Sequence, residues 1–477
     1  MSEVAVKKNK KIMDMTHGSI VRCIVLFALP LLVGNFFQQL YNMVDALVIG
    51  QKGTAGEYSA VGSVAPITNI LIGLFSGLSS GASVVISQYF GAGNKEKVSE
   101  ASHTSMTITL ISGVVFTLLG VVFSPLMVQM MLRTTEGEVY APATEYLTIY
   151  SCGMMFMLLY NMGSGILRAV GDSRRPFYYL AVAAVINTGL DFLFVYAFGM
   201  GVAGVAYATI IAQGVAALLT VITLLKTKLD VKITVKKLKI DKNILLQIIK
   251  VGIPAAIQLA LTAFSNVFVQ SYISNVNSDQ TASLGGWTTY NKIDQFVFLP
   301  IQSIALSATT FVGQNLGAGN ISRAGKGTYY SFFMAVIVTV AIMIPIMICS
   351  EGISAVFNAD PDIVRHAALL LKYLTPFYLF SCVNQVFSAS MRGAGNSIAP
   401  MIIMMSSFIV VRQIYLFVVS KFITNEFLPI AFSYPVGWGV CCVSTLIYYF
   451  AVFRFDKNKI PAVKESGEED VPSDCEE

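Results

Sequence analysis

Three acidic residues stand inside long runs of apolar residues, where an ionisable side chain is costly. They are Asp45, Asp191 and Asp294. A charged side chain at the centre of a membrane-spanning helix costs at least about 2.5–3.5 kcal/mol on insertion scales, so such residues usually serve a function. Asp191 follows Asn187 by four residues, which places both side chains on the same helix face. We therefore take these carboxylates as the candidate centres of chemistry.

Asp45, Asn187, Asp191 and Thr209 are expected to meet near one boundary of the hydrocarbon layer. With a helical rise of about 1.5 Å per residue, both carboxylates lie roughly 6–12 Å below that boundary. Two carboxylates, an amide and a hydroxyl form an all-oxygen site, which suits a hard cation such as Na⁺ or a shared proton. Because two carboxylates repel each other in a medium of low dielectric constant, one of them should take up a proton. The sequence leaves the choice between a proton and Na⁺ open.

Asp294 and Arg412 are the charged candidates in the second half of the chain, and we expect them at similar depths. A buried ion pair is the economical prediction, because opposite charges inside a membrane usually pair. Such a pair could have a structural role only. Alternatively, Asp294 attracts a cationic ligand and Arg412 sets the charge state of Asp294. Both roles remain open.

The helix that leads to Asp45 also carries residues suited to ligand binding. Gln38, Tyr41 and Asn42 have helical spacing i, i+3 and i+4, so they can share one face. Ligand pockets are mostly apolar with a few polar anchors, which these side chains would supply. Pro30, nearer the N-terminus, is expected to bend this helix, either as a hinge or as a static kink.

The candidate residues belong to a chain with the composition of a helical membrane protein. Of its 477 residues, 55% are apolar and 12% are charged, whereas about 25% are charged in soluble domains. About twelve apolar runs reach the roughly 20 residues that a helix needs to cross the hydrocarbon layer. They lie near residues 23–49, 59–88, 104–132, 146–169, 177–199, 203–225, 250–274, 284–312, 328–349, 368–390, 400–421 and 430–453. We predict an all-α polytopic membrane protein with twelve transmembrane helices.

The two halves of the chain resemble each other. Gln88–Asn94, with the sequence Gln-Tyr-Phe-Gly-Ala-Gly-Asn, recurs as Gln314–Asn320, with Gln-Asn-Leu-Gly-Ala-Gly-Asn. Leu167–Asp172 recurs in the same way as Met391–Asn396. Because each half holds an even number of spans, both have the same orientation, and the expected fold is two pseudo-symmetric six-helix lobes. Two such lobes can rock about a shared cleft and give alternating access.

This organisation predicts five segments. They are an N-terminal cytoplasmic tail at 1–21, a first lobe at 22–226, a basic cytoplasmic linker at 227–249, a second lobe at 250–454 and an acidic cytoplasmic tail at 455–477.

The repeated Gln-x-x-Gly-Ala-Gly-Asn loop, the Arg-Ala-x-Gly-Asp loop, and Val44-Asp45 followed by Gly50 resemble the multidrug and toxic compound extrusion (MATE) family. The resemblance implies a secondary antiporter that exports amphipathic, often cationic compounds in exchange for H⁺ or Na⁺. In one branch of the family the cation site of the first lobe consists of an Asp, an Asn-x-x-x-Asp pair and a Thr. The corresponding residues here are Asp45, Asn187, Asp191 and Thr209. Another branch uses a Glu on helix seven, but Val251–Ser274 contains no acidic residue, so a site of that kind is not expected.

The distribution of Lys and Arg predicts the orientation. Most of the 32 basic residues fall in the N-terminal tail, the even-numbered loops, the linker and the C-terminal segment. By the positive-inside rule these parts are cytoplasmic, so both termini are expected inside, in a bacterial inner membrane. The expected partners are small amphipathic organic cations and membrane lipids, the latter near the linker lysines. We expect no nucleic-acid partner, and we expect a monomer.

Other classes of protein fit less well. A lipid-linked saccharide flippase of similar architecture is the main alternative, but its anionic head group would need several cationic side chains in the cleft, where the spans offer only Lys292 and Arg412. The three His and seven Cys residues show no metal-ligand or catalytic spacing, so we expect no enzyme and no cofactor beyond the coupling ion. A channel is disfavoured by the doubled lobes. The glycine-rich loops do not follow β-strands, so they are not nucleotide sites.

Overall fold

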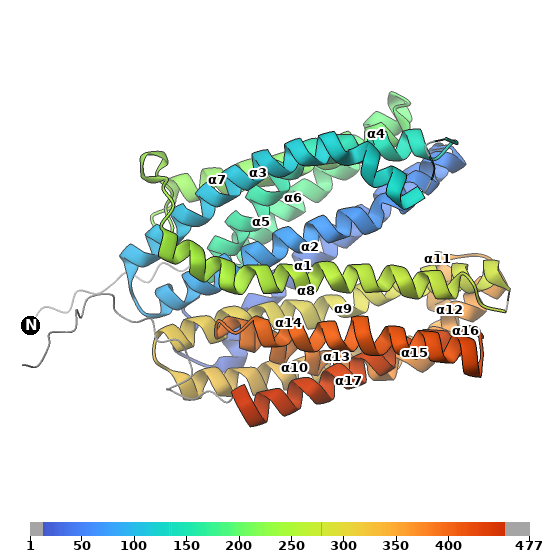
Figure 1. The fold of residues 1–477 in the computed structure, drawn as a ribbon. Helices are drawn as coiled ribbons and strands as arrows, with labels where there is room; N and C mark the ends of the chain where they lie inside the picture. Colours follow the sequence, from blue (N-terminus) through green and yellow to red (C-terminus); the bar gives the residue numbers. More distant parts are fainter. Residues whose placement is uncertain (1–12, 133, 135, 278, 454–477) are drawn as a thin grey trace, which may run out of the picture.

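The computed structural model describes residues 13–132, 134, 136–277 and 279–453, and every regular element within these ranges is a helix (Figure 1). The first lobe contains α1 (Ile20–Lys52), α2 (Ala55–Gly91), α3 (Lys95–Leu132), α4 (Tyr140–Cys152), α5 (Met154–Ala169), α6 (Arg174–Asp191), the π-helix η1 (Phe192–Ala197) and α7 (Gly201–Lys226). The 3₁₀ turn η2 (Val235–Lys237) lies in the linker.

The second lobe repeats this order with more interruptions. It contains α8 (Lys242–Ile273), α9 (Gln280–Gly317), α10 (Ile321–Ile348), α11 (Ser350–Phe357), α12 (Pro361–Leu374), η3 (Thr375–Phe377), α13 (Tyr378–Gly393), α14 (Ile398–Met405), η4 (Ser406–Val411), α15 (Arg412–Val418), η5 (Val419–Ile423), α16 (Phe427–Ala431), α17 (Ser433–Tyr448) and η6 (Tyr449–Phe453). Figure 1 shows α3–α7 gathered on one side of the bundle and α10–α17 on the other.

The expected membrane-spanning segments are present. Eleven described helices, counting those that continue through short irregular turns, are long and apolar enough to cross a membrane. The remaining expected span is built from α4 and α5, which are separated at Gly153. A Cβ atom at Gly153 would lie 2.4 Å from Cγ2 of Ile210 on α7, so the absence of a side chain at Gly153 lets α7 pack closely. The prediction of a two-lobed, all-α membrane protein is therefore confirmed, with one span broken.

Glycines on α2 bring the two lobes into direct contact. A Cβ atom at Gly77 would lie 2.2 Å from Cα of Ala256 on α8, and one at Gly81 would lie 2.5 Å from the carbonyl oxygen of Ile248. Without side chains at these positions, the backbones of α2 and α8 approach closely, as in other small-residue helix contacts. The contact runs toward the end of the bundle that carries the linker, which we call the linker end.

The linker itself is folded against the first lobe. The backbone N–H of Thr234 donates to Nε2 of His103 at 3.0 Å, and that of Asp241 donates to Oγ1 of Thr104 at 3.1 Å. Val231 and Ile233 are buried. The Asp241 carboxylate caps α8 by accepting from the backbone N–H of Ile244 at 2.9 Å, so this helix begins before the membrane boundary that the sequence predicts.

The two predicted tails are largely outside the described residues. Residues 1–12 and the whole acidic tail at 455–477 lie outside them, so the tail predictions stay untested. Residues 13–19, which belong to the predicted N-terminal tail, are described and pack against the linker end, where Met15 is fully buried.

Candidate functional site

The structure brings together the four oxygen-bearing residues predicted in the first lobe. Asp45 comes from α1, Asn187 and Asp191 from the last turns of α6, and Thr209 from α7. Oγ1 of Thr209 donates to Oδ2 of Asp45 at 3.4 Å, a long hydrogen bond, and the Asp45 carboxyl group borders both Asp191 and Asn187. Three helices distant in sequence thus converge on one cluster, which we call the first-lobe acid cluster.

This cluster is largely buried and short of hydrogen-bond partners, with Asp45 alone half-buried. Asn187 and Asp191 have no exposed surface, and Thr209 is 8% exposed. Both carboxylate oxygens of Asp191, Oδ1 of Asp45 and both amide atoms of Asn187 are buried without a hydrogen-bond partner. Buried polar atoms are costly unless they are satisfied. An arrangement of clustered acceptor oxygens satisfies this need by binding a proton or a small hard cation, so the residues fit Na⁺ as well as H⁺.

Helix irregularities lie beside the cluster. Asp191 is the last residue of α6, and the π-helix η1 starts at the next residue. Single-turn π segments within helices often occur at functional sites, because they re-aim side chains from the regular spacing. The break between α4 and α5 at Gly153 also lies near Thr209, since both residues line the same cavity.

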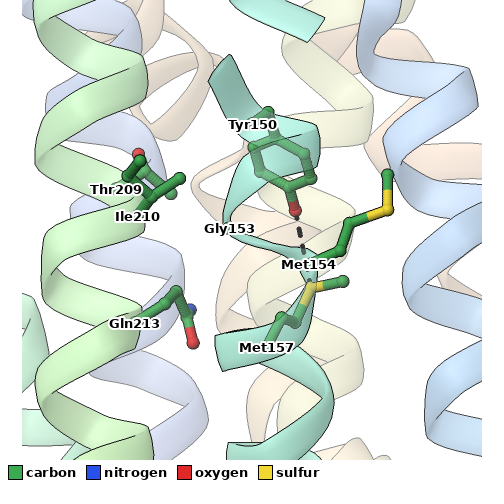
Figure 2. A pocket seen from close by; sticks show the side chains of 7 residues that line it. All are labelled: Tyr150, Gly153, Met154, Met157, Thr209, Ile210 and Gln213. Carbon is green, nitrogen blue, oxygen red and sulfur yellow. Dashed lines mark hydrogen bonds between the residues drawn. The ribbon is translucent and has the colours of Figure 1, made fainter. Parts of the chain in front are cut away.

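That cavity adjoins the cluster inside the first lobe, and Figure 2 shows its seven lining residues. They are Tyr150, Gly153, Met154, Met157, Thr209, Ile210 and Gln213. The Tyr150 hydroxyl donates to Sδ of Met157 at 3.6 Å, as the dashed line in Figure 2 marks. The empty volume of the cavity is about 210 Å³, whereas pockets for organic compounds usually measure about 300–1,000 Å³. The cavity is therefore too small to be a drug pocket, and it meets the first-lobe acid cluster at Thr209.

The three predicted ligand residues of α1 do not share one open face. Tyr41 is 6% exposed, and its hydroxyl accepts from Nε2 of Gln213 on α7 at 3.3 Å. Gln38 is half-buried and Asn42 is exposed. Their binding role stays a prediction. The buried Tyr41 side chain has little free surface with which to contact a ligand. Pro30 lies inside a continuous α1, and its role as a hinge also stays a prediction.

The predicted ion pair between Asp294 and Arg412 is wrong. Both residues lie in the described part of the chain, and each is held by other groups. Oδ1 of Asp294 accepts hydrogen bonds from the hydroxyls of Tyr378 and Tyr290, the latter at 3.4 Å. Two tyrosine hydroxyls thus occupy the place at Asp294 that the sequence analysis assigned to Arg412.

Arg412 is instead surrounded by neutral partners. Its Nη2 atom donates to Oγ of Ser265 at 2.5 Å and to Oδ1 of Asn266 at 3.1 Å. The guanidinium carbon lies 4.8 Å from the ring centroid of Tyr434 and 5.3 Å from that of Phe408, so cation–π attraction adds to these hydrogen bonds. At 2% exposure, the side chain does not present its charge to a cleft.

An aromatic cluster around Asp294 is the feature that sequence reasoning missed. Tyr290 and Tyr378 pack against the only two tryptophans of the chain, with ring centroids 5.6 Å apart for Trp287 and Tyr290 and 5.5 Å apart for Tyr378 and Trp438. A half-buried carboxylate within aromatic rings is a typical setting for an organic cation. The spacing of Tyr290 four residues before Asp294 is a signal that the sequence does offer, since it repeats that of Asn187 and Asp191.

Comparison with known proteins agrees with the doubled lobes. The family model described as MatE matches residues 30–193 and again 254–418, two matches whose first residues are 224 apart. A probable multidrug resistance protein, YoeA of Bacillus subtilis, is 30% identical over 93% of this chain and 96% of its own length. The multidrug export protein MepA of Staphylococcus aureus (strain MSSA476) is 23% identical over 82% of this chain and 85% of its own length.

The fold is shared with solved structures. An outward-facing conformation of a multidrug resistance MATE transporter of the MOP superfamily superposes with a TM-score of 0.86, at 24% identity, over 91% of this chain and 96% of that one. The family resemblance inferred from the repeated loops is thereby confirmed. With its two-lobed bundle and its two MatE matches, this chain belongs to the MATE family of membrane transporters.

Proposed function

We propose that this protein is a secondary antiporter that exports small amphipathic organic cations in exchange for inward H⁺ or Na⁺. The observation that carries the proposal is the first-lobe acid cluster, in which buried oxygens of Asp45, Asn187 and Asp191 have no hydrogen-bond partner. Such a cluster gains most from binding a small cation. The printed names of the relatives, which refer to multidrug resistance and export, support the substrate class.

Coupling follows from the position of the cluster between helices. Asp45 on α1, Asp191 on α6 and Thr209 on α7 must move relative to one another when the lobe changes shape, because each is fixed to its own helix. A bound cation draws these helices together, and its release lets them separate. Occupancy of the cluster thus favours one shape of the first lobe, which is the differential binding that coupling requires.

We assign recognition of the organic cation to Asp294 in the second lobe. Its neighbour Gln295 hydrogen-bonds to Gln39 of the first lobe, and Phe296 packs against Phe36 with ring centroids 5.8 Å apart. Asp294 therefore lies beside the interface between the lobes, where a substrate would be exchanged between the two faces. Arg412 keeps a structural role in this scheme, since its charge is buried.

We further propose that the protein acts as a monomer in a bacterial inner membrane, with the linker end in the cytoplasm. The linker and its flanking turns expose eight lysines, which are Lys226, Lys228, Lys232, Lys236, Lys237, Lys239, Lys242 and Lys250. This charge satisfies the positive-inside rule, and it would attract anionic lipids of the inner leaflet. Replacing Lys236, Lys237 and Lys239 together by Gln should weaken the effect of anionic lipid on activity in reconstituted vesicles. An equal response to anionic lipid in the variant would contradict this assignment.

The test of the proposed function is efflux of a fluorescent organic cation from cells that lack their own exporters. Asp45→Asn and Asp191→Asn should each abolish efflux while the protein still inserts in the membrane, because each change removes one of the two carboxyl groups that bind the coupling ion. Asp279→Asn is the matched control, since Asp279 is an exposed cap of α9 and Asn also caps helices well. Normal efflux by either cluster variant would refute the proposal. Export of anionic lipid-linked compounds instead would favour the flippase alternative.

A further inference from the structure

The repeated glutamine motifs hydrogen-bond across the two lobes at the linker end. Nε2 of Gln88, near the end of α2, donates to the carbonyl oxygen of Gly393 at the end of α13, at 3.0 Å. Nε2 of Gln314, near the end of α9, donates to the carbonyl oxygen of Ala169 at the end of α5, at 2.8 Å. Each motif of one lobe thus binds the second motif of the other lobe. The two bonds are equivalent under the internal symmetry, because Gln88 corresponds to Gln314 and Ala169 to Gly393.

The glycines of the same motifs permit this contact. A Cβ atom at Gly91 would lie 1.9 Å from the carbonyl oxygen of Gln314, and one at Gly317 would lie 1.9 Å from that of Gln88. Neither distance can be accommodated with the backbones in place, since the clashing atom belongs to the main chain. The ends of α2 and α9 therefore touch only because both positions are glycine, and the contact is again reciprocal.

The N-terminal segment closes over one of these bonds. The backbone N–H of Met15 donates to Oε1 of Gln314 at 3.1 Å, and Nδ2 of Asn315 donates to the carbonyl oxygen of Met15 at 3.1 Å. Met13 donates its backbone N–H to the carbonyl oxygen of Gly171 in the first lobe, at 3.2 Å. The segment is thus bonded to both lobes. If the lobes separate at the linker end, the N-terminal segment must lose its hydrogen bonds to one of them.

We propose that Gln88 and Gln314 form a two-part latch that holds the linker end closed and must open once in each transport cycle. The role of the latch in a transport cycle rests on the proposed function. The two hydrogen bonds between the lobes do not depend on it. Both bonds join a neutral amide to a backbone carbonyl, so each is weak enough to break thermally, and together they favour the closed state. Because Gln314 also accepts from the backbone N–H of Met15, its loss should weaken closure more than the loss of Gln88.

The latch can be tested by measuring the distance between the lobes at the linker end. Spin labels on cysteines replacing Lys95 and Lys326, both exposed, report this separation by pulsed electron resonance in a background without native cysteines. In the wild type the short, closed distance should dominate. The Gln88→Asn/Gln314→Asn double variant keeps both amides but shortens each side chain by one methylene, so neither reaches its carbonyl. We expect the ratio of open to closed molecules to rise about tenfold, and by an intermediate factor in each single variant.

Gln302→Ala is the control, because Gln302 is exposed on α9 and lies in the same helix as Gln314. It should leave the distance distribution unchanged. An unchanged distribution in the double variant would overturn the latch. Hydrogen exchange of the unlabelled full chain gives a second readout, since residues 13–19 should exchange faster in Gln314→Asn than in the wild type. Both measurements are made without transport. A negative export assay would therefore refute the proposed function and leave the latch standing, whereas an unchanged distance distribution would refute the latch alone.

Discussion

Replacing Asp294 by Asn should weaken the binding of organic cations without unfolding the second lobe. Asn has the same shape and can still accept from Tyr290 and Tyr378, so the aromatic cluster should persist. What is lost is one negative charge. Two unit charges about 4 Å apart interact by about 4 kcal/mol at an effective dielectric constant of about 20. Because Asp294 is half-buried and partly screened by solvent, we take about half of this value. A loss of about 2 kcal/mol raises the Kd about 30-fold.

The two tryptophans give a native assay for this prediction. Trp287 and Trp438 are the only tryptophans of the chain, and both pack against tyrosines that hold Asp294. A bound aromatic cation should therefore change tryptophan fluorescence, and titration of the purified protein yields the Kd. A neutral analogue of the same shape should bind equally well to the wild type and to Asp294→Asn. An unchanged Kd for the cation in the variant would refute the assignment of Asp294.

Three further changes have defined outcomes. Thr209→Val removes the long hydrogen bond to Asp45, which is worth about 0.5–1.5 kcal/mol. With Na⁺ as the coupling ion, its concentration for half-maximal efflux should rise about 2–10-fold, because one oxygen ligand is lost. With H⁺ it should fall by a similar factor, because the hydroxyl donates to the ionised carboxylate and so opposes protonation. Arg412→Ala should lower the free energy of unfolding by about 2–4 kcal/mol in detergent, since it removes three hydrogen bonds and two ring contacts; unchanged thermal stability would contradict this. Gly77→Ala should destabilise by about 1–3 kcal/mol, because its Cβ atom would meet Ala256, whereas Gly62→Ala on the same helix meets nothing within 4 Å and should be neutral.

Much of the fold could be predicted because it depends on patterns local in sequence. Long apolar runs determine the spans, and an i, i+4 spacing determines that Asn187 and Asp191 share a face. The meeting of these residues with Asp45 and Thr209 could also be predicted, because depth in a membrane follows from counting residues along each helix. The repeated loops identified the doubled architecture, and their hydrogen bonds across the lobes show why both copies carry Gln and Gly.

The remaining features depend on contacts between distant helices. Equal depth does not determine rotation about a helix axis, so Asp294 and Arg412 were predicted to pair although their side chains have other partners. Tyr378, which binds Asp294, stands 84 residues away along the chain. The requirement for glycine at position 153 likewise depends on Ile210 of another helix. No local pattern encodes these neighbours.

Transport by the purified protein in liposomes, under a pH gradient and a sodium gradient imposed separately, tests most directly whether the first-lobe acid cluster binds the coupling ion. Uptake of a fluorescent organic cation should be driven by at least one gradient in the wild type and in Asp279→Asn, and by neither in Asp191→Asn. The gradient that drives it names the ion. Gradient-driven transport that persists in Asp191→Asn, or transport indifferent to both gradients in the wild type, would contradict the account.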